Sequence, residues 1–167
     1  MWRAGHIAAP GDLDNFLTPV VKALGGYRTF ALVWARRGQP GEASTLTIGP
    51  AKDARLFLEC RPPHAHARLF ASATSTAWKR ALAGAVGGHE TASRTGPVEL
   101  VIRFGVSPQR NWVALWKPAI DSIGGVLGEG KRCWHPRDDR ISLLVLQREI
   151  RPALAWNVEL DLWWEEP

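Results

Sequence analysis

The stretch NWVALWKPAIDSIGGVLG (residues 111–128) is the part of the chain whose pattern decides the fold. Four apolar residues recur along it at helical spacing and form one stripe: Val113, Trp116, Ile120 and Ile123. The preceding stretch PVELVIRFGV (97–106) reads as a strand. Because an apolar helix face needs a flat apolar partner, we expect the helix 112–123 to pack Trp116 and Ile120 against a sheet.

Outward from this stretch, the chain reads as further strands and helices. Strand patterns occupy residues 28–37, 44–49, 98–106, 141–150 and 156–164. A helix is expected from Phe16 to Leu24 and another within 66–86, whereas 59–68 reads as a loop. The order α-β-β-α-β-α-β-β predicts one α+β domain over residues 1–167, with a mixed or antiparallel sheet and helices packed on it.

Composition narrows the class of protein before it says anything about chemistry. The 167 residues contain 46% hydrophobic side chains and no run of about 18 apolar residues, so no transmembrane helix and no membrane partner is expected. The first residues lack the apolar region of a signal peptide, and two cysteines suit a reducing cytoplasm. A net charge of +5 permits binding to a polyanion without requiring it.

Two segments of the chain form a short partial repeat. TPVVKALGG (18–26) and KPAIDSIGG (117–125) align proline with proline and Gly-Gly with Gly-Gly, and each is followed by two predicted strands. Helices that end in Gly-Gly are common, so chance similarity is one interpretation. The other is an internal pseudo-duplication with half-repeats 11–51 and 97–165.

Two aspartates precede the first predicted helix, in GDLDNF (11–16). Asp12 or Asp14 suits a helix N-cap, because its carboxylate accepts hydrogen bonds from the free N–H groups of the first turn. One such residue is enough for a cap. The alternative is a metal site, since clustered carboxylate oxygens are the ligands that a hard divalent cation prefers.

A second group of charged residues lies in the C-terminal half of the chain. Lys117 and Asp121 are four residues apart, hence on one face of the predicted helix. Asp138 and Asp139 come just before the strand 141–150. A carboxylate pair at such a junction suits metal ligation, but the pair taken alone favours a solvated turn.

Taken together, these residues resemble the RusA-type Holliday junction resolvases. In that family a strand leads to a D-x-D-N-x-x-K-x-x-x-D motif at a helix start, and a D-D pair then opens a strand. Lys117 matches the motif lysine, Asp121 the helix aspartate, and Asp138-Asp139 the acidic pair. The resemblance covers residues from about 78 to 165 and implies an α+β fold and Mg²⁺-dependent cleavage of branched DNA.

The sequence departs from the family pattern at one point. NWVALW (111–116) stands where D-x-D-N belongs, and the missing motif occurs instead as Asp12, Leu13, Asp14 and Asn15. If the two halves pack together, Asp12, Asp14, Asp138 and Asp139 form a composite Mg²⁺ site, with Lys117 and Asp121 as catalytic residues. If they do not, the chain is a catalytically inactive relative that binds nucleic acid.

The loop before the acidic pair is basic and offers a candidate contact surface for DNA. Four basic residues lie near Trp134 and His135: Lys131, Arg132, Arg137 and Arg140. Arginine beside an aromatic residue suits contact with phosphates and bases, and a solvated basic loop has the same composition.

Two further alternatives remain open. A zinc site has the ligand types it needs in five residues, although their spacing fits no zinc pattern: Cys60, His64, His66, Cys133 and His135. The chain is alternatively an interaction module, in which the nine tryptophans form a homodimer interface and the aspartates are only caps.

Overall fold

The computed structural model describes residues 2–7, 13–24, 27–28, 30–38, 44–49, 61–70, 72–87, 95–130 and 133–167. Seven strands form one sheet: β1 (Trp2–Ile7), β2 (Leu32–Arg36), β3 (Ser44–Gly49), β4 (Ala65–Leu69), β5 (Val98–Val106), β6 (Ile141–Ile150) and β7 (Val158–Glu165). The α-helices are α1 (Leu13–Ala23), α3 (Thr76–Val86), α4 (Trp116–Asp121) and α5 (Gly124–Leu127). Short 3₁₀ turns η2 (Val113–Leu115), η3 (Asp138–Arg140) and η4 (Pro152–Leu154) precede α4, β6 and β7.

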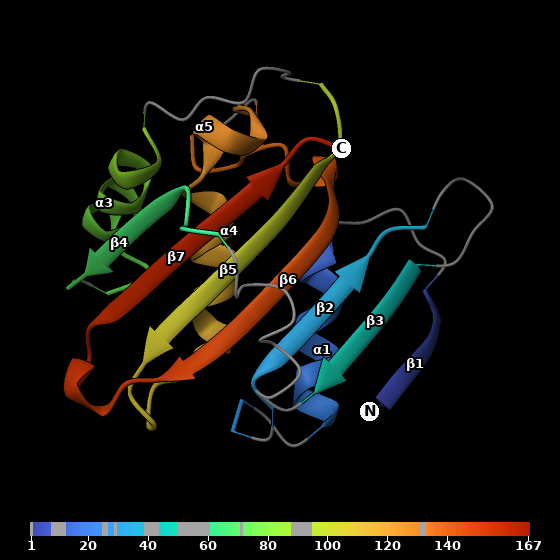
Figure 1. The fold of residues 1–167 in the computed structure, drawn as a ribbon, viewed down its shortest axis with the longest axis horizontal. Coiled ribbons are helices and arrows are strands. Elements are labelled where there is room, and N and C mark those ends of the chain that lie inside the picture. Colours follow the sequence, from blue (N-terminus) through green and yellow to red (C-terminus); the bar gives the residue numbers. More distant parts are fainter. Residues whose placement is uncertain are drawn as a thin grey trace.

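The sheet is mixed, with the strand order β1-β3-β2-β6-β5-β7-β4 (Figure 1). β5 and β6 are parallel, and every other neighbouring pair is antiparallel. The four predicted strands 28–37, 98–106, 141–150 and 156–164 therefore lie in a common sheet, as expected. The α+β fold class with a mixed sheet is confirmed.

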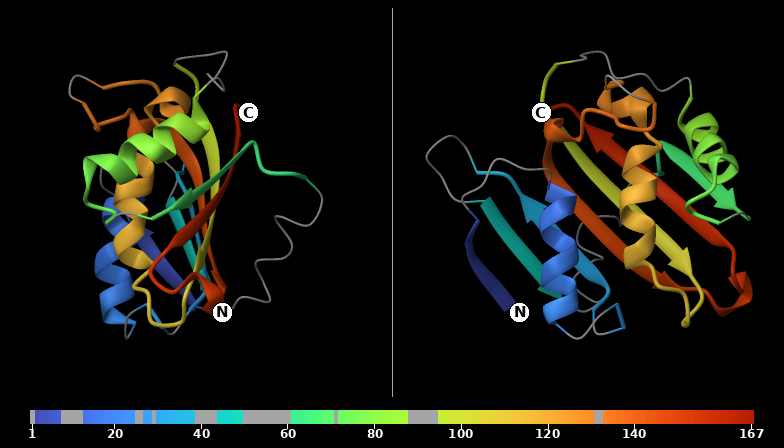
Figure 2. Two further views of the ribbon diagram at one scale, coloured as in Figure 1. Left: turned by 90° about the vertical axis from the view of Figure 1, so that its left-hand side faces the viewer. Right: turned by 180° about the vertical axis from the view of Figure 1, so that it is seen from behind.

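The helices cover one face of the sheet, where α1 and α4 lie side by side (Figure 2). Strand residues of alternating positions point into this layer, so that β5 buries Val98, Leu100, Ile102 and Phe104 completely. Trp112 and Trp116 meet there in an edge-to-face contact of 4.9 Å between ring centroids. Trp116 and Ile120 are buried in this core, which confirms the predicted packing of the helix on the sheet.

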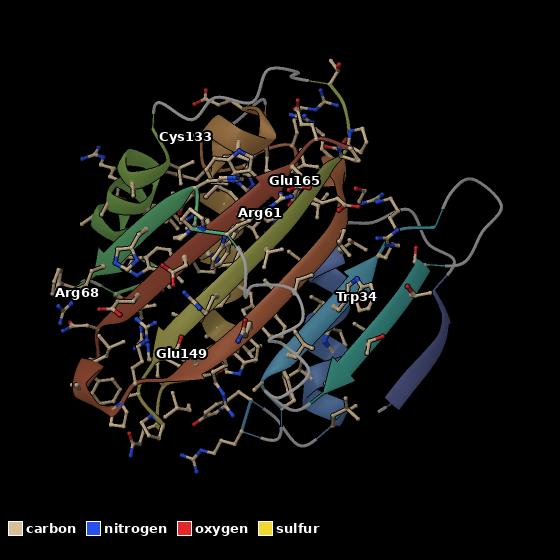
Figure 3. The ribbon with its side chains drawn as sticks, in the orientation of Figure 1. Trp34, Arg61, Arg68, Cys133, Glu149 and Glu165 are labelled. Atoms are coloured by element: carbon tan, nitrogen blue, oxygen red, sulfur yellow. The ribbon has the colours of Figure 1, made fainter. Side chains whose placement is uncertain are left out.

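The opposite face of the sheet carries charged and aromatic side chains (Figure 3). Arg103 of β5 and Asp161 of β7 are paired in register on this face. A smaller apolar group, Leu32, Leu143 and Val145 with Trp34 and Val101, lies there as well. The two faces therefore differ in chemistry, and the larger core lies under the helices.

Three expectations about the elements were wrong or incomplete. Residues 65–69 form strand β4 rather than loop and helix, because Ala65, Ala67 and Leu69 are buried alternately while β4 pairs with β7. The helix 112–123 is divided into η2 and the short α4, and a turn at Ser122 separates α4 from α5. Strand β1, at one edge of the sheet, is missing from the predicted order of elements, which begins with a helix.

The two half-repeats contribute differently to the sheet. In the first, the two strands that follow the helix, β2 and β3, are antiparallel neighbours, whereas in the second the corresponding strands β6 and β7 are separated by β5. The same order of one helix and two strands therefore leads to different strand pairings in the two half-repeats. Within the described part of the chain, no helix is long and apolar enough to cross a membrane.

Candidate functional site

The directions of the strands bring several of the predicted site segments to one edge of the sheet. β1 and β2 are both antiparallel to β3, and β2 is antiparallel to β6, so β1 ends at the edge where β5 and β6 begin. α1 follows β1 and therefore starts at this edge, whereas α4 follows β5 and ends there. The start of α1, the end of α4 and the start of β6 share this edge (Figure 2). Asp14 belongs to the first turn of α1, Asp121 ends α4, and Asp138 belongs to η3 before β6.

Lys117 joins two aspartates at this edge. Its Nζ lies 2.8 Å from Oδ2 of Asp138 and 3.3 Å from Oδ1 of Asp121. A second lysine, Lys79 of α3, lies 3.5 Å from Oδ2 of Asp121. Both carboxylates are largely buried, which strengthens their attraction to the ammonium groups. The predicted placement of Lys117 and Asp121 on one helix face is confirmed, and we name Lys79, Lys117, Asp121 and Asp138 the lysine–aspartate cluster.

Asp139 lies beside this cluster but points away from it. Its carboxylate is 61% exposed and lies 3.6 Å from Nη2 of Arg137. The two members of the acidic pair therefore have different surroundings, because the 3₁₀ turn η3 directs successive side chains to different sides. Asp138 faces Lys117, and Asp139 faces solvent.

The structure describes one of the two aspartates of the first half-repeat, and only its backbone. Asp12 lies outside the described residues, and for Asp14 the backbone alone is described, as the second residue of α1. Convergence of Asp12 and Asp14 with Asp138 and Asp139 stays a prediction. Among the described residues, no three His, Cys, Asp or Glu side chains form a group suited to a metal ion.

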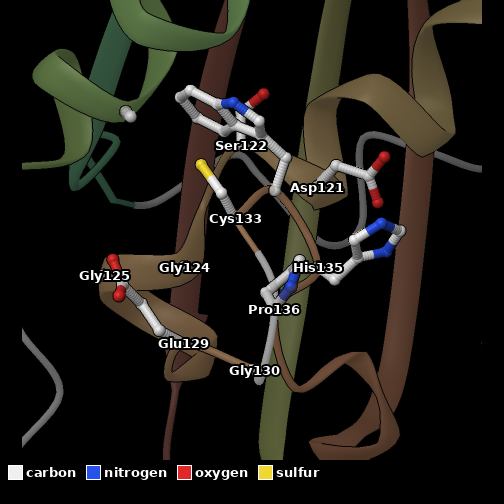
Figure 4. Close-up of a pocket in the computed structure, with 11 residues that line it drawn as sticks. Asp121, Ser122, Gly124, Gly125, Glu129, Gly130, Cys133, His135 and Pro136 are labelled. Atoms are coloured by element: carbon white, nitrogen blue, oxygen red, sulfur yellow. The ribbon is translucent and has the colours of Figure 1, made fainter.

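A pocket of about 390 Å³ opens next to the cluster (Figure 4). It is bounded by α3 at Ala83, by the junction of α4 and α5 at Asp121 to Gly125, and by the segments 129–130 and 133–136, which an antiparallel bridge joins and which we call the hairpin. We call it the hairpin pocket. Its lining residues are Ala83, Asp121, Ser122, Gly124, Gly125, Glu129, Gly130, Cys133, Trp134, His135 and Pro136.

Three backbone features shape the hairpin. Glu129 and Pro136 form an isolated antiparallel bridge, and a Cβ at Gly130 would lie 2.0 Å from the carbonyl oxygen of His135. Only glycine permits this approach. Trp134 has a φ of 61°, a left-handed conformation that is uncommon for a bulky residue. Its ring lies 5.8 Å from Nζ of Lys79, so the hairpin and the cluster are in contact.

The four basic residues predicted to contact nucleic acid have different positions. Lys131 and Arg132 lie outside the described residues. Arg137 is 42% exposed. Arg140 is directed inward, where its guanidinium donates to the carbonyl oxygens of Gly96 and Leu127 and to Glu166. With 2% of its side chain exposed, Arg140 is unsuited to a phosphate contact and belongs to the core.

The residues considered for zinc lie in two different places. His64 and His66 belong to the approach to β4 and to β4 itself, where they bond to Trp164 and Asp161 of β7. Cys133 and His135 line the hairpin pocket on the helix side. Cys60 lies outside the described residues.

A charged network on the open face of the sheet was not singled out from the sequence. Asp161 accepts from Nε and Nη2 of Arg103 at 2.9 and 2.7 Å, and its Oδ1 lies 2.7 Å from Nδ1 of His66. Burial by itself raises the pKa of Asp161, but the hydrogen bonds from His66 and Arg103 outweigh it and hold the pKa below its usual range. The sequence hints at this network only by placing one ionisable residue among apolar neighbours in each of the three strands: His66 in β4, Arg103 in β5 and Asp161 in β7.

Comparison with known proteins adds no relative. No protein-family model matches the chain, and neither the curated proteins nor the solved structures contain a significant match.

Proposed function

We propose that the protein is a RusA-like, Mg²⁺-dependent endonuclease that hydrolyses phosphodiester bonds in branched or structured DNA, as in the resolution of Holliday junctions. The proposal includes a cytoplasmic location and a role in DNA recombination or repair. The observation that supports it is the lysine–aspartate cluster, which lies at the edge of the sheet where α1 begins with Asp14.

The donor groups at this edge are suited to Mg²⁺. The carboxylate of Asp139 is 61% exposed, and a Mg²⁺ site in a nuclease needs only one or two carboxylates besides water and phosphate oxygens. Asp139, with Asp12, Asp14 and Asp138, would hold the ion, which supplies Lewis-acid activation of the phosphodiester and of a water molecule. Lys117 offers an ammonium group to the negative charge that develops on the phosphate.

The test is cleavage of a synthetic four-way junction. We expect the wild type to cleave it with Mg²⁺, and we expect Asp14→Asn and Asp139→Asn to lose cleavage by a factor of about 100 or more while remaining folded, because each removes a carboxylate charge. Glu165→Gln is the matched control. Glu165 lies on the face of the sheet opposite the helices and the lysine–aspartate cluster, where it is 57% exposed and paired with Arg61 (Figure 3). Full activity of Asp14→Asn would show that this residue is a helix cap.

A second candidate is a nucleic-acid-binding protein without catalytic activity. The observation that favours it is the pairing of Asp121 with both Lys79 and Lys117, and of Asp138 with Lys117, because these ammonium groups neutralise the carboxylates. Tight junction binding by the wild type without cleavage in Mg²⁺ or Mn²⁺ would favour this candidate over the nuclease.

A further inference from the structure

We infer that the hairpin pocket binds one unpaired nucleobase of the DNA and prefers a base that carries an exocyclic amino group. The inference rests on the proposed function, which supplies the DNA, and it goes further by assigning a task to residues outside the carboxylate site. It is carried by the size and position of the pocket, by the tryptophan that lines it, and by its acceptor groups.

The size and the position of the pocket suit a single base beside a reacting backbone. A volume of about 390 Å³ lies within the range of small-molecule sites. Asp121 belongs both to the pocket lining and to the lysine–aspartate cluster, so the two sites adjoin. A nucleotide whose phosphate lies near Lys117 therefore has its base within reach of the pocket.

Trp134 provides an aromatic surface at the pocket. Bases of single-stranded nucleic acid stack on such side chains, and the contact is open to every base because each has a π-face. The left-handed backbone of Trp134, with φ at 61°, is strained for a side chain of this size, and strain of this kind clusters at binding sites. The ammonium group of Lys79, 5.8 Å from the ring centroid, helps to hold the indole in place.

The polar groups that line the pocket include three acceptors, beside the imidazole of His135. Asp121 and Glu129 contribute carboxylates, and the hydroxyl of Ser122 donates its hydrogen to the carbonyl oxygen of Pro118 at 2.6 Å, which leaves its oxygen as an acceptor. Adenine, cytosine and guanine carry exocyclic amino groups that donate hydrogen bonds, whereas thymine has none. The lining therefore favours these three bases over thymine.

The experiment measures binding of the full chain to fluorescein-labelled duplexes by anisotropy, in Ca²⁺ in place of Mg²⁺. Each duplex has a single-nucleotide bulge that is adenine, cytosine, guanine, thymine or an abasic residue. Gly125→Leu is the main variant, since Gly125 lines the pocket and a Cβ there meets no atom within 4 Å, which leaves room for a side chain that narrows the pocket. Gly84→Leu is the matched control, because Gly84 of α3 is equally open and does not line the pocket.

A second variant tests the pocket independently, so that the result does not depend on the folding of Gly125→Leu alone. Trp134→Gly removes the stacking surface and at the same time suits the left-handed backbone of this position. Circular dichroism of both variants and of the control establishes that the fold is retained.

We expect the wild type and Gly84→Leu to bind the amino-bearing bulges at least tenfold more tightly than the thymine bulge, and the abasic bulge most weakly. Gly125→Leu and Trp134→Gly are expected to bind all five duplexes with the affinity that the wild type has for the abasic one. Equal wild-type affinity for all five would overturn the base pocket while leaving DNA binding intact, and so would a preference that survives in both variants. Absence of binding to all five duplexes would overturn the pocket, and binding of the same protein to the four-way junction would then show whether the proposed function still stands.

Discussion

At the scale of the residue, burial decides what Arg140 does. Its guanidinium donates to Gly96 at 2.6 Å, to Leu127 at 3.0 Å and to Glu166 at 2.9 Å, and in this way it ties three separate segments together. Its near neighbour Arg137 is 42% exposed. The two arginines have the same charge, but only Arg137 is positioned to meet a partner in solution.

Arg140→Met should lower the free energy of unfolding by about 2–4 kcal/mol, because it removes three hydrogen bonds from a buried charged group and leaves two carbonyl oxygens without this donor. Arg137→Ala, the surface control, should change it by less than about 1 kcal/mol. Urea unfolding followed by tryptophan fluorescence measures both. A loss below 1 kcal/mol for Arg140→Met would mean that the three contacts contribute little.

The sequence identifies the types of side chain at the site better than it predicts where each side chain points. Helical spacing correctly paired Lys117 with Asp121, since residues four apart on a helix are neighbours whatever lies around them. The inward turn of Arg140 depends on carbonyl groups of Gly96 and Leu127, which no local pattern reveals. The approach of Lys79 to Asp121 likewise depends on how α3 packs near α4.

At the scale of the element, β4 is held in the sheet by side chains as well as by its backbone. His66 of β4 and Arg103 of β5 both bond to Asp161 of β7, so one carboxylate joins three neighbouring strands. β4 is also the element that sequence reasoning missed. Its residues AHARL favour a helix by composition, and pairing with β7 overrides that preference.

Asp161→Asn should lower the free energy of unfolding at pH 7 by about 1–3 kcal/mol, because Arg103 loses its charged acceptor. The pKa of Asp161 is lowered on folding, so its contribution is complete above the unfolded-state pKa of about 4 and is lost as the pH falls through the folded-state pKa. Thermal unfolding at pH 7, 5, 4 and 3 checks this. The difference between wild type and variant should shrink below pH 4, and a constant difference would contradict it.

At the scale of the whole molecule, the sheet separates two chemically different sides. The helix side holds the main core, and the hairpin pocket and the lysine–aspartate cluster lie on this side at one edge of the sheet. The strand order of the C-terminal half was not predictable, since β5 and β7 become neighbours through a pairing that local periodicity does not encode. The predicted α+β class needed only the types and order of the elements.

The net charge of +5 belongs to the whole molecule and predicts how DNA binding depends on salt. We expect the logarithm of the binding constant to fall linearly with the logarithm of the salt concentration, because basic side chains displace counterions from the phosphates. Arg137→Ala should reduce the slope by about one, whereas the control Arg68→Ala should leave it unchanged. Arg68 is 52% exposed and lies near the end of β4, which is parallel to β5 and therefore ends at the opposite edge of the sheet. Binding titrations at KCl concentrations from about 50 to about 300 mM measure this slope. An unchanged slope in Arg137→Ala would place the contact surface elsewhere.

The position of β6 and β7 inside the sheet has a consequence for the order of events during synthesis and folding. β2 has its central neighbour in β6, more than one hundred residues later, and β4 is joined to β5 only through β7. During synthesis, the edge of β2 that pairs with β6 and the edge of β4 that pairs with β7 therefore stay unpaired until residues 141–165 have left the ribosome. Contacts so distant in sequence slow folding, and exposed edges invite association with other chains. A chaperone that covers nascent strand edges would be of most use to this protein before β6 emerges.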